Sequence, residues 1–301
     1  NGMAHAIRSR TLSADAAALL TAAGPARAGL RRTLKALGFA DPATAAANLE
    51  ALTPTPRDAE LLAPALGRLL AELAAAPDPD MALNNLERYA SAVDRSVFFR
   101  TLVGHPGAIP LLARLGGSSQ FLADALRRHP STLAWLLEPA TMRVWLAEDL
   151  AADLARSLHP FETREARIGA LRRFKYRHLL RIGARDLLGD ADLALTTQEL
   201  SDLADACLAE AWRAADARAR EQYGPPLGAG GAETGLAVIA MGKLGGQELN
   251  YSSDIDLMFA YGADGETGGG REGHVANGEY YARVCRDIVA WLDTATDEGY
   301  V

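Results

Sequence analysis

The sequence predicts an α+β protein in which a mostly helical N-terminal region precedes a small α/β domain with a mixed sheet. Alanine and leucine dominate, while aromatic residues make up only 6% of the 301 residues, a balance that favours packed helices. Residues 1–222 show helical periodicity interrupted by proline. After a stretch rich in proline and glycine, short apolar runs bounded by glycine replace that periodicity, as in buried strands.

Composition narrows the class of protein. A chain of 301 residues is long enough for two domains with a substantial core. No apolar run approaches the roughly 20 residues that span a bilayer. Cys207 and Cys285, the only two cysteines, are far apart in the sequence, so we expect no disulfide framework and a reducing cytoplasm. The formal net charge of −7 would repel nucleic acid. We therefore expect a cytoplasmic protein that binds neither membranes nor nucleic acid.

Proline marks the helix boundaries in residues 1–222. Asp41-Pro42, residues 54–56 and residues 77–79 separate stretches rich in alanine and leucine. The stretch from Arg57 to Ala75 predicts one helix whose leucine stripe packs against neighbouring helices. Asn1 and Gly2 are expected to be a non-native remnant ahead of Met3.

Three histidines, His105, His129 and His159, each precede a proline at the end of a helical stretch. Together they could be ligands of a metal ion. The residue before a proline leaves the α region, however. We therefore favour the interpretation that these histidines mark the ends of helices.

Residues 161–188 predict a long helix with an unusual charge. Eight arginine and lysine residues lie from Arg164 to Arg185, together with His178, and Glu165 is the only acidic residue among them. This face could bind an anionic group or an acidic partner, or it could be a solvated helix face. The sequence does not decide between these interpretations.

A further helix is expected to begin at Thr196 or Thr197. Thr196 and Glu199 have the spacing of a capping box, in which the two side chains satisfy backbone N–H groups at the helix start. Cys207 lies on the apolar stripe of this helix and is expected in the core rather than at a reactive site.

The composition changes at residues 223–234, which predict a linker because they are rich in proline and glycine. The linker would separate a helical domain, residues 1–222, from a second domain, residues 235–301. The second domain is expected to contain strands at residues 236–240 and 254–261, a mobile loop with seven glycines at residues 262–278, an amphipathic helix at residues 279–292 and the start of another strand at residue 300.

The candidate site lies between the two predicted strands. Residues two apart on a strand share a face, so Asp254 and Asp256 should point the same way. Neither carboxylate has an obvious basic partner nearby in the sequence, and a divalent cation would relieve their repulsion. Mg²⁺ favours hard oxygen ligands, typically one or two carboxylates plus phosphate oxygens and waters. The pair therefore predicts a metal site that grips phosphate groups.

Gly245 and Gly246 supply the other half of the pattern. Without Cβ atoms, their backbone N–H groups can approach a phosphate closely, and Ser252 and Ser253 add hydroxyl donors. The alternative is an ordinary β-turn followed by a strand with an acidic, solvent-facing pair. We favour the site, since aspartate is a poor strand former and two of them would be an odd choice there.

A pair of glycines followed by Asp-x-Asp resembles the DNA polymerase β-type nucleotidyltransferase superfamily. Residues 242–257 resemble one family within it, the bifunctional glutamine synthetase adenylyltransferase/adenylyl-removing enzymes. The resemblance covers most of the chain from about residue 90 onward. The other segments that carry it are Leu171–Phe174, Leu180–Ile182, Arg185–Gly189, Leu200–Asp205 and Asp297–Val301.

The resemblance implies a reaction. Residues 248–250 with 252–256 resemble the N-terminal half of these enzymes, which removes AMP from glutamine synthetase by phosphorolysis and releases ADP. By resemblance, Asp254 and Asp256 would hold Mg²⁺ or Mn²⁺. Gly245, Gly246, Ser252 and Ser253 would position the phosphates of a nucleotide (ATP or ADP). Lys243 either assists them or is a structural surface lysine. The family also implies regulation by a nitrogen-signalling PII protein.

The resemblance also leaves alternatives open. The superfamily uses a third acidic residue on a later strand, expected just past Val301, so the site is expected to be truncated and the chain poorly active alone. The rival enzymatic interpretations are the ATP-dependent adenylylating activity and another polymerase β-type transferase. The non-enzymatic one is a catalytically incomplete module for regulation or partner binding.

Overall fold

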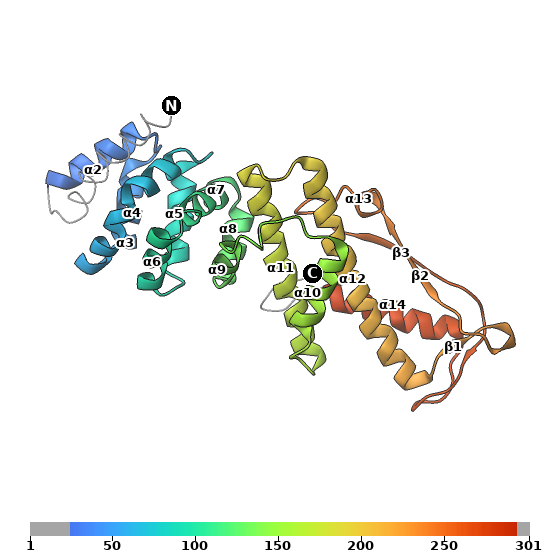
Figure 1. Ribbon diagram of the computed structural model, residues 1–301. Coiled ribbons are helices and arrows are strands. Elements are labelled where there is room, and N and C mark those ends of the chain that lie inside the picture. The colour runs from blue at the N-terminus through green and yellow to red at the C-terminus, as the bar shows by residue number, and fades with distance from the viewer. Residues whose placement is uncertain (1–24, 294–301) are drawn as a thin grey trace. The chain divides into compact units, whose positions relative to one another are not determined.

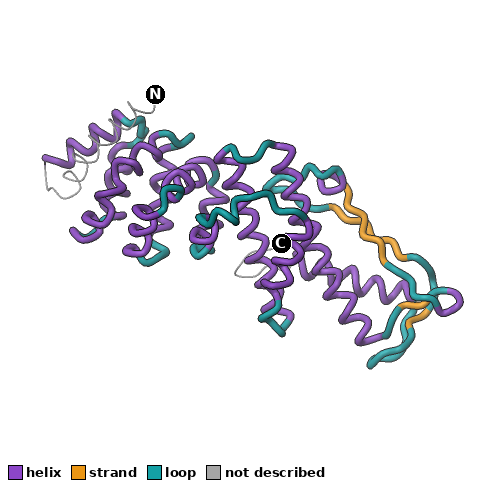
Figure 2. Tube along the Cα trace, viewed as in Figure 1, coloured by secondary structure: helices purple, strands orange, loops and turns teal. Residues whose placement is uncertain are grey.

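The computed structural model describes residues 25–293 (Figure 1). Helices account for most of this range, and strands occur only after residue 225 (Figure 2). The predicted α+β class is thereby confirmed. The predictions made for Asn1, Gly2 and residues 297–301 lie outside the described residues.

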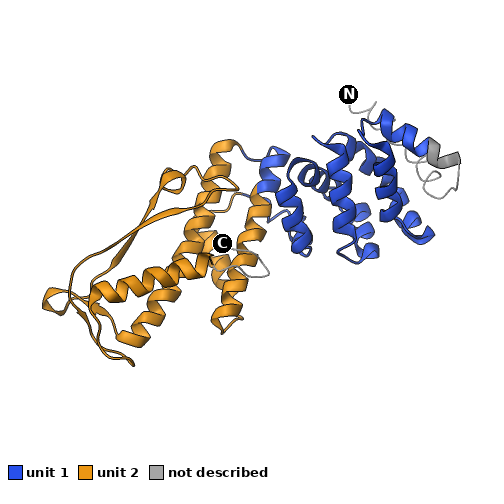
Figure 3. Cartoon of the chain, turned by 180° about the vertical axis from the view of Figure 1, so that it is seen from behind, with its two compact units in different colours: residues 1–143, 183–191 blue, residues 144–182, 192–301 orange. Residues whose placement is uncertain are grey.

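The chain forms two compact units (Figure 3). Unit 1 comprises Asn1–Arg143 and Gly183–Ala191, and unit 2 comprises Val144–Ile182 and Asp192–Val301. The long helix α11 (Arg164–Leu188) contributes residues to both. The composition-based boundary at residues 223–234 falls within unit 2 and stays a prediction.

Three helices of unit 1 begin in the same way. Asp41, Thr55 and Asp78 each stand before a proline in the first turn, and each side chain accepts a hydrogen bond from a backbone N–H of that turn. Proline suits this position because its missing N–H would have no partner, and such a cap stabilises by about 1 kcal/mol. The helices of unit 1 are α2 (Pro25–Ala36), α3 (Pro42–Leu52), α4 (Pro56–Ala74), α5 (Pro79–Ala90), α6 (Arg95–Gly104), α7 (Ala108–Ser118), α8 (Gln120–Arg128) and α9 (Thr132–Leu136).

Two predictions about the helices are confirmed. Helix α4 carries the predicted leucine stripe, and Leu62, Leu66 and Leu69 on it are fully buried. His105 and His129 follow the last residues of α6 and α8, and His159 follows α10 (Ala147–Leu158) in unit 2. All three histidines therefore end helices, as the His-Pro spacing indicated.

Helix α12 (Leu193–Tyr223) starts earlier than predicted. Its N-cap is Asp192, whose carboxylate accepts the N–H of Leu195 at 2.8 Å. Thr196 is buried inside the helix, and the Glu199 carboxylate accepts a hydrogen bond from Arg181 at 2.7 Å instead of capping. The predicted capping box was wrong because Glu199 has a long-range partner that local spacing cannot reveal. The prediction for Cys207 is confirmed: it is buried, and burial raises the pKa of its thiol to about 12.

The basic residues of α11 are largely paired inside unit 2. Arg181 and His178 are fully buried. Arg177 and His178 both contact the Asp153 carboxylate of α10, and Arg181 pairs with Glu199 of α12. This helix is not simply a solvated face, because acidic side chains of the neighbouring helices occupy much of its basic side. Binding of an anionic group by the remaining basic residues stays a prediction.

His178 lies at the centre of this polar cluster. Arg181 Nε donates to His178 Nδ1 at 3.3 Å, so Nε2 carries the proton and donates to Asp153 at 2.9 Å. The rings of Trp145 and Phe174 enclose the imidazole, with centroids 4.8 and 4.6 Å away. Burial lowers the pKa of His178 to about 4, with Arg181 and Arg177 opposing protonation and Asp153 favouring it. The folded protein therefore holds this histidine neutral.

The His178 environment predicts acid sensitivity. Between pH 6.5 and 4 the unfolded chain binds a proton at this histidine and the folded chain does not, so the free energy of unfolding falls with falling pH. The full effect is up to about 3 kcal/mol, at about 1.4 kcal/mol for each unit of pKa shift. We expect urea denaturation at a series of pH values to show this loss of stability. His178→Gln should remove the part of the pH dependence that comes from this histidine. An equal pH dependence in both proteins would contradict the assignment.

The strands of unit 2 form two antiparallel pairs within the described residues. Strand β2 (Leu236–Met241) pairs with β3 (Asp256–Tyr261), and β1 (Pro226–Leu227) pairs with β4 (Glu266–Thr267). No described pair is parallel, so the expected mixed sheet is not observed there. The connection from β2 to β3 contains the short helix α13 (Gly242–Gly245) and turns, and it returns the chain antiparallel to β2.

The glycine-rich segment after β3 was wrongly predicted to be a mobile loop. It contains β4, and its backbone bonds to the predicted linker: the N–H of Gly269 donates to the carbonyl of Tyr223 at 2.9 Å. Gly224 has φ +77°, and a Cβ there would lie 2.4 Å from the carbonyl oxygen of Gly269. Glycine at position 224 thus permits the close approach of two segments that composition alone describes as flexible.

Helix α14 (Asn277–Asp293) confirms the predicted amphipathic helix. Val284 and Ile288 are buried on its apolar stripe, and the helix packs along α12. The ring of Tyr281 stacks on Tyr261 of β3 at 5.3 Å. This contact ties the β2–β3 hairpin to the helices of unit 2. No helix within residues 25–293 is long and apolar enough to cross a membrane.

Candidate functional site

The β2–β3 register brings the two halves of the candidate motif together. Met241, the last residue of β2, lies opposite Asp256, the first residue of β3. Helix α13 follows Met241 directly, so the glycine turn begins beside the acidic pair. Met241 and Asp256, 15 residues apart in the sequence, are thus neighbours because the strands are antiparallel.

The two aspartates occupy alternate, exposed positions. Strand β3 begins at Asp256 rather than at the predicted residue 254, so Asp254 lies just before the strand. The burial pattern nevertheless alternates across both: Asp254 and Asp256 are exposed, whereas Ile255 and Leu257 are partly buried. Within residues 25–293, neither carboxylate makes a hydrogen bond or an ion pair. Both are therefore available to a ligand.

Gly242 lies at the candidate site, although the sequence did not single it out. Its φ is +55°, and a Cβ built on it would lie 3.2 Å from Oδ2 of Asp256. The chain turns sharply here from β2 into α13, in a conformation that favours glycine. A glycine directly after a predicted strand indicated a turn at this position. The interpretation of the sequence relied on the nearby Gly245-Gly246 pair instead.

Gly242→Ala is predicted to weaken both the fold and the site. A left-handed alanine costs roughly 1–2 kcal/mol, and its methyl group would press on the Asp256 carboxylate. We expect a loss of that size in the free energy of unfolding, measured with urea, together with weaker metal-dependent nucleotide binding. Gly235→Ala is the matched control, since a Cβ at Gly235 meets nothing within 4 Å. Equal behaviour of the two variants would refute the role of Gly242.

Gly245 and Gly246 shape the turn. A Cβ at Gly245 would lie 2.5 Å from the carbonyl oxygen of Ala240, so this residue lets α13 fold back onto β2. The N–H of Gly246 donates to the carbonyl of Gly242 at 3.1 Å. In this structure that N–H therefore serves the turn, and its predicted contact with a phosphate stays a prediction.

The two serines lie on one turn organised by Asn250, and Lys243 of α13 reaches this turn. The amide oxygen of Asn250 accepts the N–H of Ser252 at 3.1 Å and the hydroxyl of Ser253 at 2.7 Å. Lys243 Nζ lies 3.5 Å from Ser253 Oγ. Asn250 is a further positioning residue that the sequence analysis did not single out. The signal was an asparagine two residues before a serine, the spacing of an Asx-turn.

The donor set suits a hard divalent cation with phosphate ligands. Two carboxylates without protein partners can supply oxygen ligands to Mg²⁺ or Mn²⁺, which complete their shells with phosphate oxygens and waters. The ammonium of Lys243 adds a positive charge on the side of the serine turn. In the part of the chain that is described, no group of three histidine, cysteine, aspartate or glutamate side chains could hold a metal ion. The candidate site is thus a carboxylate pair.

Comparison with known proteins points to one family. The profile described as glutamate-ammonia ligase adenylyltransferase matches residues 109–301. Three similar curated proteins each carry the name bifunctional glutamine synthetase adenylyltransferase/adenylyl-removing enzyme. The protein of Burkholderia pseudomallei is 40% identical over 61% of this chain and 20% of its own length. That of Nitrosococcus oceani is 36% identical over 72% and 22%, and that of Thioalkalivibrio sulfidiphilus is 33% identical over 91% and 29%. The chain thus spans less than a third of the length of these relatives.

Proposed function

The chain belongs to the glutamate-ammonia ligase adenylyltransferase family, and we propose that it removes AMP from an adenylylated tyrosine of glutamine synthetase by metal-dependent phosphorolysis. The observation that carries this proposal is the exposed pair Asp254 and Asp256, which has no partner among the described residues and stands beside the turn at Gly242. Family membership supports the substrate class. The motif of residues 248–256, which resembles the deadenylylating half of these enzymes, supports the direction.

The proposed reaction balances without a covalent enzyme intermediate. An oxygen of inorganic phosphate forms a bond to the phosphorus of AMP, the bond from that phosphorus to the tyrosyl oxygen breaks, and the tyrosyl oxygen takes up a proton. The products are ADP and unmodified tyrosine. No side-chain nucleophile is required, so positioning and charge stabilisation provide most of the acceleration.

The acidic pair, the two serines and Lys243 each have a role in this scheme. Asp254 and Asp256 would hold the divalent cation, which would supply positive charge to offset the charge that builds on the phosphoryl oxygens. Ser252 and Ser253 orient phosphate oxygens through their hydroxyl groups. Lys243 Nζ, 3.5 Å from Ser253 Oγ, adds a positive charge to the same turn.

The test is a reaction of a protein that comprises this chain and the strand expected just past Val301 with adenylylated glutamine synthetase, phosphate and Mg²⁺, with ADP as the readout. Release of ADP supports the proposal. ATP-dependent labelling of unmodified glutamine synthetase, without ADP release in the first mixture, would assign the adenylylating direction instead. A chain that binds glutamine synthetase but releases no ADP, with binding that ignores Asp254→Asn/Asp256→Asn, would indicate a partner-binding module and overturn the enzymatic proposal.

Partners and location follow from the same proposal. The protein acts on glutamine synthetase in the cytoplasm, as part of a nucleotidyltransferase that regulates nitrogen assimilation. A nitrogen-signalling PII protein is a proposed regulator. A pull-down of this chain with purified PII protein tests that partnership, and absence of binding to the complete enzyme would exclude it.

A further inference from the structure

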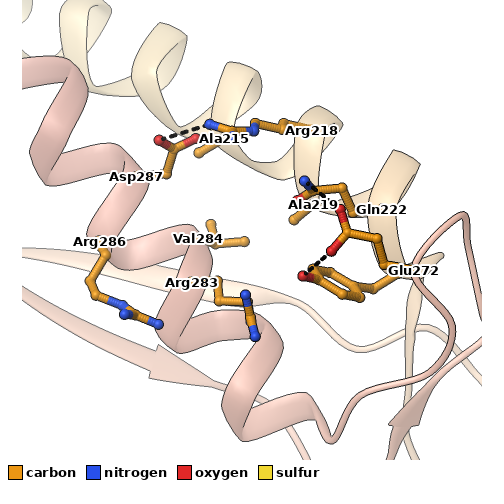
Figure 4. A pocket seen from close by; sticks show the side chains of 10 residues that line it. Ala215, Arg218, Ala219, Gln222, Glu272, Arg283, Val284, Arg286 and Asp287 are labelled. Atoms are coloured by element: carbon orange, nitrogen blue, oxygen red, sulfur yellow. Dashed lines mark hydrogen bonds and ion pairs between the residues drawn. The ribbon is translucent and has the colours of Figure 1, made fainter.

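A polar groove in unit 2 has no part in the proposed reaction. It lies between α12 and α14, has a volume of about 340 Å³, and is closed on one side by Glu272 from the glycine-rich segment (Figure 4). None of the predicted site residues lines it. Its volume is within the range of small-molecule pockets.

Three arginines line the groove and make it basic: Arg218 from α12, and Arg283 and Arg286 from α14. Two carboxylates also line it, but both already have partners. Asp287 pairs with Arg164 and lies 3.8 Å from Arg218. Positive charge is therefore in excess in this part of an acidic chain.

Glu272 is held by neutral donors. Its carboxylate accepts the hydroxyl of Tyr223 at 2.8 Å and the amide of Gln222 at 3.1 Å. These two bonds fix the carboxylate at the edge of the groove next to α12. The arginines of α14 line the opposite part of the groove.

Arg283 and Arg286 are three residues apart on α14, so their side chains lie on neighbouring positions of one helix face. Arg283 pairs with Glu279 at 2.6 Å and covers the ring of Tyr223 at 5.1 Å. Arg286 donates through Nε to its own helix, to the carbonyl of Ala282 at 3.1 Å. Among residues 25–293 it has no carboxylate within 4 Å.

We propose that this groove binds a small anion of the phosphate class, with Arg286 as its principal ligand and Arg283 and Arg218 beside it. Guanidinium groups present a planar fork of N–H donors that matches phosphate oxygens. A phosphate carries between one and two negative charges at pH 7, so it offsets the excess charge more fully than a carboxylate does. The source of the phosphate is either the free ion or a nucleotide.

The experiment separates this groove from the carboxylate site. The chain carrying Asp254→Asn/Asp256→Asn is titrated with inorganic phosphate in the presence of EDTA, and binding is followed by phosphorus NMR line width or calorimetry. We expect saturable binding of phosphate. Arg286→Ala should weaken this binding roughly tenfold, because one charge-assisted pair is lost. Arg286→Lys should weaken it less. Arg57→Ala on α4 is the matched control. Arg57 is also an exposed helical arginine with no carboxylate partner in the described residues.

The outcomes are distinct. Tighter binding of ADP than of phosphate, again lost in Arg286→Ala, assigns a nucleotide phosphate; equal affinities assign the free ion. Both support the proposal. Absence of saturable binding, equal binding by Arg286→Ala and Arg57→Ala, or equal affinity for phosphate and acetate would overturn it. Because the metal is removed in every arm, failure of the proposed phosphorolysis does not affect these results.

Discussion

Asp256→Asn is expected to lower the release of ADP from adenylylated glutamine synthetase by at least about 100-fold, comparable to the loss of one electrostatic contact in a transition state. The neutral amide cannot replace the carboxylate as a ligand of a divalent cation, and Asp254 alone would hold that cation weakly. The fold should be unaffected, since Asp256 is exposed and has no partner among the described residues. Initial rates at saturating phosphate, with urea denaturation of the same samples, measure both effects.

The matched control is Asp264→Asn. Asp264 is also an acidic residue of the hairpin region, but it follows β3 at the opposite end and accepts the hydroxyl of Tyr261 at 2.8 Å. Replacement of Asp264 should keep the rate of ADP release within about twofold of the wild-type rate, because substitutions away from a site usually have small effects. Metal-dependent nucleotide binding gives a second readout that does not require turnover. Unchanged ADP release and nucleotide binding in Asp256→Asn would end the enzymatic proposal.

Local patterns were enough to indicate where several helices begin or end. The Asp-Pro and Thr-Pro pairs that start α3, α4 and α5 act within one turn, so their effect is readable from adjacent residues. The His-Pro pairs are readable for the same reason. The juxtaposition of the glycine turn and Asp256 was also accessible, because one antiparallel return between neighbouring strands produces it.

Long-range partners were not accessible in this way. The basic face of α11 is explained by Asp153 on α10 and Glu199 on α12, and sequence spacing does not reveal which acidic residues meet it. The same holds for β1 and β4, whose pairing fixes two segments that look flexible by composition. A glycine after a predicted strand indicates a turn at Gly242, but its closeness to the Asp256 carboxylate depends on where that carboxylate lies in space.

The buried pair of Arg181 and Glu199 predicts the largest effect on stability. Their side chains are 0% and 1% exposed and lie 2.7 Å apart. Glu199 also accepts the backbone N–H of Trp145 at 3.3 Å. Glu199→Ala would leave a buried guanidinium without its main counter-charge, at a cost of about 3–5 kcal/mol. Urea denaturation followed by tryptophan fluorescence should show this loss. Arg213→Ala provides a control, because that arginine contacts Glu210 from an exposed position.

The double variant Arg181→Met/Glu199→Leu separates the cost of an unpaired charge from the value of the pair. Replacing both partners by apolar side chains removes the buried charges together, and such replacements are often neutral or stabilising. Here Arg181 also donates to His178, and Glu199 accepts the N–H of Trp145, so the double variant loses two further hydrogen bonds, each worth about 1 kcal/mol. We therefore expect it to be more stable than Glu199→Ala and slightly less stable than the wild type. If the double variant were as unstable as the single one, packing around Trp145, and not burial of charge, would be the main reason that Glu199 stabilises unit 2.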